Sequence, residues 1–233
     1  MSVITSIRAQ LAPIHREGYP FIGGFAVIAI VLFWLWQPLG WIAVAAMLWC
    51  VYFFRDPPRV TPAREGLVVA PADGRISRIS RVVAPPELDF GDETFLRISI
   101  FMSVFDCHIN RSPVAGRIER IVYRAGAFIS ADLDKASESN ERNAFVIATN
   151  GGGRIPVVQI AGLVARRIVP FVHEGEAIEA GQRIGMIRFG SRVDIYLPAA
   201  TVALVAEGQT AVAGETVLAD FAALQTERTF KTD

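Results

Sequence analysis

The sequence predicts a mainly β protein, a β-sandwich or open barrel, preceded by a hydrophobic helical hairpin. From Leu67 onward, short runs rich in valine and isoleucine alternate with glycine and proline, a pattern typical of antiparallel sheets. No long amphipathic helical pattern interrupts these runs. Between Tyr19 and Phe54, by contrast, almost every residue is apolar, which predicts a pair of apolar helices.

The apolar segment is expected to form a hairpin over residues 19–55, after an N-terminal segment of residues 1–18. Gln37–Gly40 divides it into two limbs, Tyr19–Trp36 and Leu39–Phe54. A helix of ~18 residues spans about 27 Å, slightly less than the ~30 Å hydrocarbon core of a bilayer. The limbs therefore fit a hairpin that enters or just crosses a membrane.

Arginines flank this hairpin on both sides. Arg8 and Arg16 precede it, and Arg55, Arg59 and Arg64 follow it. The positive-inside rule then places both ends in the cytoplasm, so residues 56–233 are expected at the cytoplasmic face of the cell's inner membrane. The long, tryptophan-rich apolar stretch disfavours a cleaved signal peptide. A hairpin buried in a soluble core is the remaining alternative.

Composition narrows the classes of function. The 233-residue chain has a net charge of zero, so it lacks the basic excess that a nucleic-acid partner requires. Cys50 and Cys107 lie in different parts of the chain and cannot readily pair, which agrees with a reducing compartment. The cysteines and the three histidines show no ligand spacing, and no metal site is expected.

Two internal repeats refine the fold expected for residues 56–233. Pro71–Ile76 is echoed by Pro113–Ile118, and Glu174–Gln182 by Glu207–Glu215. Such duplicated units resemble the barrel-sandwich hybrid of lipoyl and biotinyl carrier domains. Neither repeat carries a lysine turn for a swinging arm, so a carrier role is not expected. The predicted strands are Leu67–Val69, Ile76–Val83, Phe95–Ile100, Gly116–Tyr123, Ala144–Ala148, Pro156–Ala161, Arg183–Ile187 and Val193–Leu197.

A Gly-Ser pair, Gly190–Ser191, lies inside the strand-like run Arg188–Asp194. Roughly one such dipeptide is expected by chance in a chain of this composition, and alone it would indicate an ordinary turn at a strand end. Its interest comes from three further segments elsewhere in the chain.

These segments are Ala70–Gly74, Phe101–Pro113 and Asp134–Asn143. Together with Phe189-Gly190-Ser191, and in this order, they resemble the short bacterial form of phosphatidylserine decarboxylase. The resemblance covers most of the chain from Arg55 onward, and the combination of four segments is highly specific.

The resemblance implies a self-processing enzyme. The chain would cut itself between Gly190 and Ser191, leaving a large chain (1–190) and a small chain (191–233) that stay associated. The Ser191 hydroxyl attacks the preceding carbonyl, helped by the conformational freedom of glycine, and elimination then leaves a pyruvoyl group at position 191. This cofactor would form a Schiff base with the substrate amine and take up the electrons released with carbon dioxide.

The expected activity is decarboxylation of the membrane lipid phosphatidylserine to phosphatidylethanolamine, by a pyruvoyl decarboxylase domain of residues 56–233. One alternative is another serine phospholipid as substrate, such as an ether-linked lipid. A second is a noncatalytic membrane adaptor built on a biotinyl-like sandwich. The sequence leaves open whether copies of the chain associate.

His108 is the main candidate for proton transfer. Phe101–Ile109 is predicted to be one strand, so Asp106 and His108 would share a face while Cys107 points away. A carboxylate that orients an imidazole suits a general acid and base. Asp73 matches the family's aspartate, although Asp-Gly after Pro is also a common turn signal.

The chain departs from longer members of the family at one position. Those members carry a second histidine, which belongs to a charge-relay set with an aspartate and the cleaved serine, and Arg111 stands there instead. His108 is therefore expected to serve cleavage, turnover or both, with Asp73 or Asp106 behind it. In the polar connector Lys135–Asn143, Arg142 is the candidate for binding the lipid phosphate.

Overall fold

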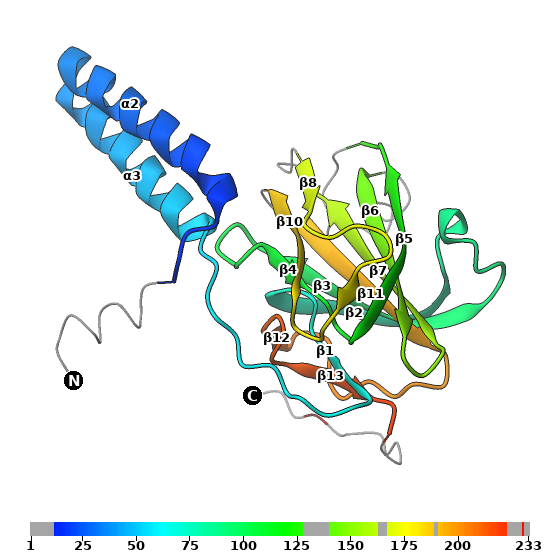
Figure 1. The fold of residues 1–233 in the computed structure, drawn as a ribbon. Coiled ribbons are helices and arrows are strands. Elements are labelled where there is room, and N and C mark those ends of the chain that lie inside the picture. The colour runs from blue at the N-terminus through cyan, green and yellow to red at the C-terminus, as the bar shows by residue number, and fades with distance from the viewer. Residues whose placement is uncertain (1–11, 128–139, 163–166, 189–190, 223–229, 231–233) are drawn as a thin grey trace. The chain divides into compact units, whose positions relative to one another are not determined.

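The computed structural model describes residues 12–127, 140–162, 167–188, 191–222 and 230. The chain forms two compact units, residues 1–58 and 59–233. The first contains the 3₁₀ turn η1 (Arg16–Gly18) and the helices α2 (Tyr19–Leu35) and α3 (Gln37–Phe53). The second contains the strands (Figure 1).

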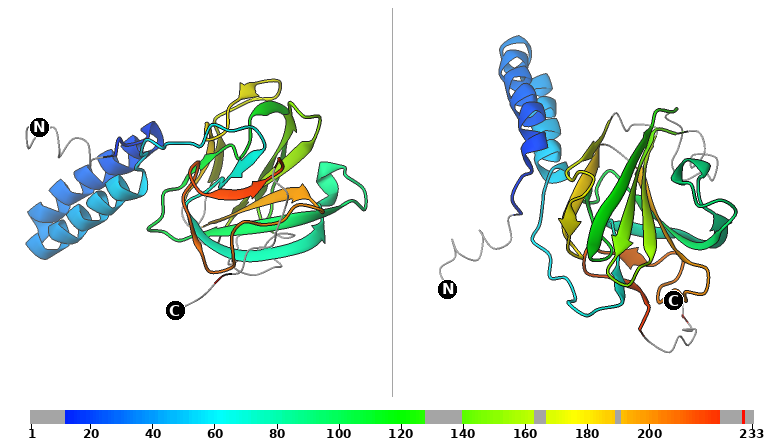
Figure 2. Two further views of the ribbon diagram at one scale, coloured as in Figure 1. Left: turned by 90° about the horizontal axis from the view of Figure 1, so that it is seen from below. Right: turned by 45° about the vertical axis from the view of Figure 1, so that its right-hand side comes forward.

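Helices α2 and α3 lie side by side as a hairpin (Figures 1 and 2). A single extended residue, Trp36, separates them, which is a shorter break than the expected Gln37–Gly40. The break is short because Pro38 is accommodated in the first turn of α3, where a missing backbone N–H costs nothing. A Cβ at Gly40 would lie 2.4 Å from the Phe33 ring, so glycine permits this close approach of the helices.

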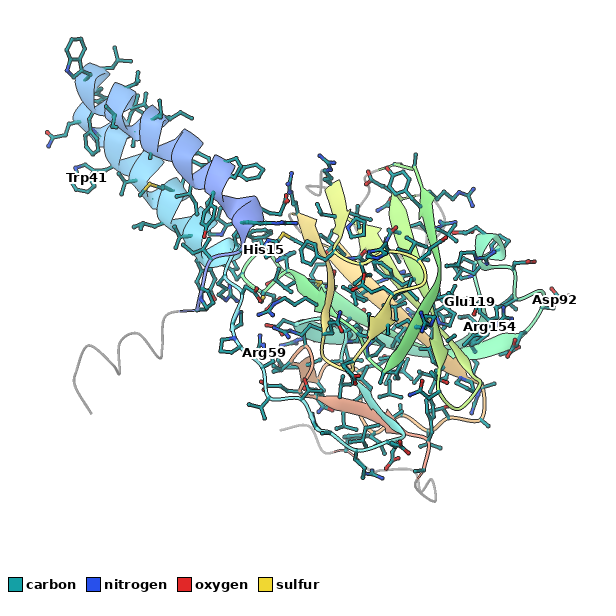
Figure 3. The ribbon with its side chains drawn as sticks, viewed as in Figure 1. His15, Trp41, Arg59, Asp92, Glu119 and Arg154 are labelled. Carbon is teal, nitrogen blue, oxygen red and sulfur yellow. The ribbon has the colours of Figure 1, made fainter. Side chains whose placement is uncertain are left out.

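The hairpin exposes most of its large apolar side chains. Trp34 is 94% exposed, and Trp41 projects outward from α3 (Figure 3). Among the described residues, the segment Arg16–Leu35 is long and apolar enough to cross a membrane, with a mean hydropathy of 2.0. Gln37–Phe53 is a shorter apolar helix. The two helices thus carry apolar surface that the unit itself does not bury.

Antiparallel sheets form the second unit, which confirms the mainly β prediction. The largest is an eight-stranded sheet in the order β12-β2-β3-β11-β7-β6-β5-β9, curled into a half-barrel (Figure 2). Two small sheets have the orders β4-β10-β8 and β1-β13. The kinship with barrel-sandwich hybrids stays a prediction.

The strands have the following bounds: β1 Leu67–Val69, β2 Gly74–Val83, β3 Thr94–Met102, β4 Ile109–Arg111, β5 Gly116–Arg124, β6 Arg142–Thr149, β7 Arg154–Ala161, β8 Arg167–Pro170, β9 Ala177–Ile178, β10 Arg183–Arg188, β11 Ser191–Pro198, β12 Thr210–Ala211 and β13 Val217–Asp220. A second 3₁₀ turn, η2, covers Pro86–Leu88.

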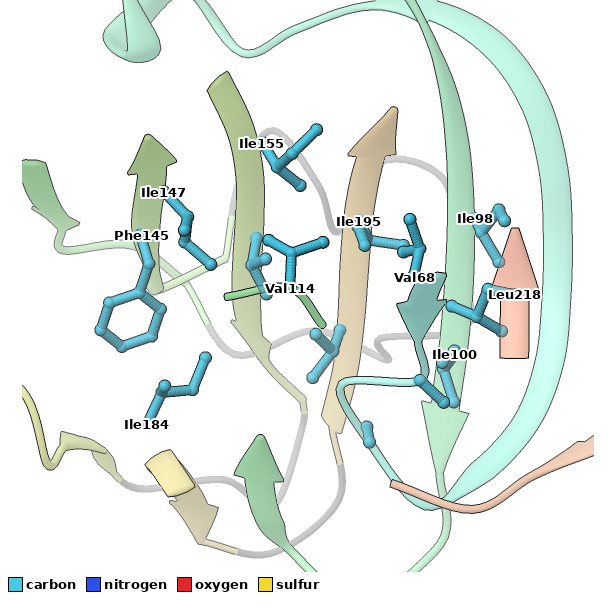
Figure 4. Close-up of a cluster of buried hydrophobic side chains, with 14 of the residues drawn as sticks. Val68, Ile98, Ile100, Val114, Phe145, Ile147, Ile155, Ile184, Ile195 and Leu218 are labelled. Carbon is cyan, nitrogen blue, oxygen red and sulfur yellow. The ribbon is translucent and has the colours of Figure 1, made fainter. Parts of the chain in front are cut away.

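The curled sheet buries apolar side chains on both faces. Alternate residues of β3 and β11, such as Ile98 and Ile195, join side chains of the small sheets in the inner cluster, part of which Figure 4 shows. The intervening residues, such as Phe95 and Tyr196, join the segment around η2 in the outer cluster. The outer cluster comprises Ala84, Leu88, Phe95, Ala144, Val146, Val158, Ile160 and Tyr196. Successive side chains of a strand point to opposite faces. Because both faces are buried here, the sequences of the central strands are nearly continuous apolar runs.

Glycine is required where β2 begins. Gly74 has a φ of 148°, and a Cβ there would lie 2.1 Å from the Phe101 carbonyl oxygen. The contact is with backbone, so a side-chain movement cannot relieve it. This is the glycine of the Asp73-Gly74 pair, and it lets β2 approach the end of β3 closely.

We predict that Gly74→Ala lowers the free energy of unfolding by about 3 kcal/mol, from backbone strain and overpacking together. The matched control is Gly208→Ala, which has a φ of 87° but no atom within 4 Å of the added Cβ. That variant should lose about 1 kcal/mol, from strain alone. Denaturant unfolding of the full chain in detergent measures both, and equal losses would contradict the prediction.

Candidate active site

Ser191 begins the central strand β11. It pairs with Met102 at the end of β3 and with Ala161 at the end of β7. Its side chain is fully buried, and Oγ donates to Met102 Sδ at 3.4 Å. A thioether is a weak acceptor, so little free energy is lost when the hydroxyl turns away from it.

The chain changes sheets immediately before Ser191. Strand β10 ends at Arg188 in a small sheet, and β11 begins at Ser191 in the large sheet. Gly190, the predicted cleavage residue, falls between them and lies outside the described residues. In the sequence, the predicted cleavage position therefore lies between a strand of the small sheet and a strand of the large sheet.

The expectation that Phe101–Ile109 is one strand is wrong. Strand β3 ends at Met102, and Ser103–Asp106 forms a turn. The Asp106 carboxylate accepts from the Ser103 backbone N–H at 2.7 Å, and the Asp106 N–H donates to the Ser103 carbonyl at 3.0 Å. Aspartate closes turns in this way because its short side chain reaches nearby backbone donors.

His108 follows the turn and is fully buried. Its Nδ1 lies 3.0 Å from the Asp106 carbonyl oxygen. A carbonyl can only accept, so Nδ1 carries the proton in this contact. Asp106 thus contacts the imidazole through its backbone, whereas the sequence had suggested its carboxylate.

Backbone contacts place His108 beside the strand that leads to Ser191. The His108 carbonyl accepts from Ile187 of β10 at 3.4 Å, and the next residue, Ile109, pairs with Met186. The histidine is thereby held opposite a residue close in sequence to the predicted cleavage position. The pairing of β4 with β10 thus places His108 beside β10, the strand that precedes Ser191 in the sequence.

Asp73 is held by two other groups. One carboxylate oxygen accepts from Arg59 at 2.5 Å, and the other from the Ala213 N–H at 2.7 Å. Its loop reaches β4 through a hydrogen bond from the Arg111 N–H to the Pro71 carbonyl at 2.9 Å. These contacts stabilise the loop, and a role for Asp73 behind His108 stays a prediction.

Arg111, which stands in place of the family's second histidine, anchors a turn. Its guanidinium donates to the Gly181 carbonyl at 2.8 Å, and the residue is buried. Gly214 lies next to its side chain: a Cβ there would be 3.1 Å from Arg111 Cδ. Arg111 thus links β4 to two turns, which contain the equivalent glycines Gly181 and Gly214 of the second internal repeat.

Arg142 lies on the outer face of β6 and forms an ion pair with Glu87, beside η2. Burial acts to raise the pKa of Glu87, but the Arg142 hydrogen bond and the charges of Arg142 and Arg124 outweigh it and hold that pKa below its usual value. Ser191 belongs to the inner face of the sheet. Binding of lipid phosphate by Arg142 stays a prediction, and the structure assigns it a contact that stabilises the outer cluster.

The residue after Ser191 is equally constrained. Arg192 forms a two-bond ion pair with Asp194, at 2.9 and 3.0 Å, on the outer face. Both side chains are buried. Burial and the Asp194 carboxylate raise the pKa of Tyr196 far above its usual value, so its phenol stays protonated. This buried pair restrains the start of β11 from the face opposite to the Ser191 side chain.

Sequence reasoning missed a row of buried amides on the inner face. Asn143 Nδ2 donates to Gln159 Oε1 at 3.1 Å, and Gln159 Nε2 donates to Asn110 Oδ1 at 2.8 Å. Asn110 Nδ2 in turn lies 3.6 Å from Met102 Sδ, the sulfur that accepts from Ser191. A signal existed, since Gln159 is the one polar residue in the run Ile155–Ala161.

Strands on both sides of the predicted cleavage position are interleaved. Beyond Ser191, β11 lies between β3 and β7, β12 pairs with β2, and β13 pairs with β1. All four partner strands precede residue 190. A cut at this position would separate two chains that share a large sheet and a core.

Comparison with known proteins relates the chain to one family. A family model described as phosphatidylserine decarboxylase matches residues 46–219. A curated protein from Nitrobacter winogradskyi, named phosphatidylserine decarboxylase proenzyme, is 66% identical over 227 residues, which cover 97% of this chain and 91% of the relative. The family match includes Ser191, His108 and the amide row.

Proposed function

The chain belongs to the phosphatidylserine decarboxylase family, and on this premise we propose that it converts phosphatidylserine to phosphatidylethanolamine and carbon dioxide after cutting itself between Gly190 and Ser191. The observation that carries the proposal is a 66% identical relative named as a proenzyme. A proenzyme requires a processing site, and the buried serine at the sheet crossing supplies one.

The local chemistry suits a pyruvoyl group made from Ser191. The residue is fully buried, held by a weak acceptor and fixed by strand pairing on both sides, so water is excluded and the backbone cannot drift. Such a group supplies a carbonyl that accepts the electrons released when carbon dioxide leaves. The chain's own task is to hold position 191 rigidly and to move protons there.

His108 is the residue we assign to proton transfer. Its ring is oriented by the Asp106 carbonyl, which leaves Nε2 as the basic atom. Since Arg111 is committed to the Gly181 carbonyl and stays protonated near neutral pH, it does not replace a second histidine. One imidazole then serves both self-cleavage and turnover.

Cleavage is expected to leave the large and small chains associated. The small chain contributes β11, β12 and β13, each paired with strands of the large chain. Its inner-face residues, such as Val193 and Ile195, are fully buried in the shared core. Separation of the two chains would expose this core to water. The free-energy cost of that exposure is far larger than the gain in chain entropy from breaking one peptide bond.

We further propose that α2 and α3 anchor the enzyme at the cytoplasmic face of the inner membrane. Exposed tryptophans and aliphatic residues cover the hairpin, and water would disfavour so large an apolar surface. Arginines at both ends of the hairpin favour a cytoplasmic location for both. An enzyme acting on a membrane lipid requires this proximity to its substrate.

Ser191→Ala should yield a single uncut chain without decarboxylase activity, because alanine lacks the attacking oxygen. Ser99→Ala is the matched control: Ser99 is buried on the neighbouring strand β3, and its Oγ forms no hydrogen bond among the described residues. That variant should cleave normally. Intact mass and carbon dioxide release measure both, and normal cleavage of Ser191→Ala would refute the processing site.

His108→Ala should accumulate uncut chain and slow carbon dioxide release by about 10²–10⁴-fold, as expected when a general acid or base is lost. The control is His173→Ala, whose side chain is 84% exposed and pairs with Glu176. Fragment masses and carbon dioxide release follow both steps. If His108→Ala matches the control in both, its role is structural only.

Replacing Tyr19–Phe54 with a polar linker should release the protein from phospholipid vesicles, because that segment carries the contiguous exposed apolar surface. Self-cleavage of the truncated chain serves as the control for folding of the remaining domain. Co-sedimentation with vesicles measures binding. A cleaved, truncated protein that sediments as well as the full chain would place the anchor elsewhere.

A further inference from the structure

The three buried amides of Asn143, Gln159 and Asn110 donate in one direction. Asn143 presents its N–H to Gln159, which fixes the Gln159 amide with its own N–H toward Asn110. Asn110 must then offer its oxygen to Gln159, and its nitrogen turns toward Met102 Sδ. Each amide therefore sets the orientation of the next, and the row ends beside Ser191.

The fold buries this row of amides in a space that neighbouring residues leave open. Asn110 and Gln159 are fully buried, and Asn143 is nearly so. Asn110 belongs to the small sheet and Gln159 to the large one, so their hydrogen bond crosses between sheets. A Cβ at Gly185 of β10 would lie 2.9 Å from Gln159 Nε2, so only glycine leaves space for the amide there.

The last donor of the row meets a weak acceptor. Asn110 Nδ2 and Ser191 Oγ both contact Met102 Sδ, at 3.6 and 3.4 Å. Buried polar groups normally find strong partners, because an unsatisfied amide costs about 1–3 kcal/mol. An oriented N–H whose one acceptor among the described residues is a thioether, next to a reactive hydroxyl, is set up to donate more strongly when negative charge develops nearby.

We propose that Asn110 stabilises the Ser191 oxygen during self-cleavage, and that Gln159 and Asn143 are positioning residues that aim its N–H; the proposal rests on the proposed function above. In the first step the Ser191 O–H bond breaks and a base, assigned above to His108, takes the proton. The oxygen bonds to the carbonyl carbon of residue 190, the C–N bond of that amide breaks, and the nitrogen of residue 191 takes the proton back, so the amide becomes an ester and an amine. In the second step a base removes the α-proton of residue 191 and the bond between Cβ and the ester oxygen breaks, which releases the upstream chain as a carboxylate and leaves a dehydroalanine.

Asn110→Ala provides the first test, with the full chain synthesised in a cell-free system containing phospholipid vesicles. Pulse-labelled precursor is followed on denaturing gels. Loss of a donor to the negative charge that develops on the Ser191 oxygen as its proton leaves should slow cleavage about 10²-fold, without changing the melting temperature by more than the control does. The control is Tyr196→Phe, which removes a buried polar group from the opposite face of β11 and should cleave at the normal rate.

Gln159→Glu tests the aiming of the N–H with almost no change in shape. A protonated glutamate can still donate to Asn110 Oδ1, whereas an ionised one only accepts and forces Asn110 to present its oxygen toward Ser191. Burial among uncharged amides raises the pKa of such a glutamate well above its usual value, so cleavage of this variant should slow as the pH rises from about 6 to about 9. The unsubstituted chain, which relies on a neutral imidazole, should show the opposite trend.

The outcomes separate this proposal from the proposed function. If Ser191→Ala remains uncut while folded Asn110→Ala cleaves at the control rate, processing stands and the role of Asn110 is overturned. If Asn110→Ala does not fold, the pH profile of Gln159→Glu decides, and a profile parallel to that of the unsubstituted chain overturns the proposal. Cleavage of Ser191→Ala would instead remove the function on which both rest.

Discussion

The pairing of β11 between β3 and β7 is the constraint on which most of this structure depends. The strand shares a full ladder with β3 and a shorter one with β7, so its backbone cannot shift without breaking both. This pairing places the side chain of Ser191 against Met102 and buries it completely. It also allows the chain beyond residue 190 to stay folded whether or not the peptide bond before it is intact.

Burial on both faces of the curled sheet has electrostatic consequences. Toward the outer face, the charged side chains of β11 and β6 are matched by partners, Asp194 for Arg192 and Glu87 for Arg142. An unmatched charge at these positions would be strongly destabilising. Toward the inner face, the polar side chains are uncharged amides that satisfy one another. The amides of Asn143, Gln159 and Asn110 are thus uncharged and oriented by their hydrogen bonds to one another.

The turn at Ser103–Asp106 shows how a small local interaction determines the geometry of a site. The Asp106 carboxylate closes the turn through the Ser103 N–H, which frees the Asp106 carbonyl to orient the His108 ring. The chain then continues into β4, which pairs with β10, so His108 lies beside the strand that leads to Ser191. Orientation by a backbone carbonyl fixes the tautomer of the imidazole without adding a negative charge beside it.

The sequence by itself determined the features that depend on short-range pattern. Alternating Val/Ile runs with glycine turns were sufficient to predict the mainly β class, and the apolar segment Tyr19–Phe54 to predict the helical hairpin. Both predictions succeed because the spacing of apolar residues along the chain reflects which side chains each element buries. The four family-like segments named Ser191 and His108 as candidate site residues. The tertiary structure decided which groups meet across strands: Asp106 turned its carboxylate to Ser103, Arg142 to Glu87, and Asn110 joined Gln159 across two sheets. Such contacts depend on strand register and on sheet packing, which arise from pairings between distant parts of the chain and leave little trace in the local sequence.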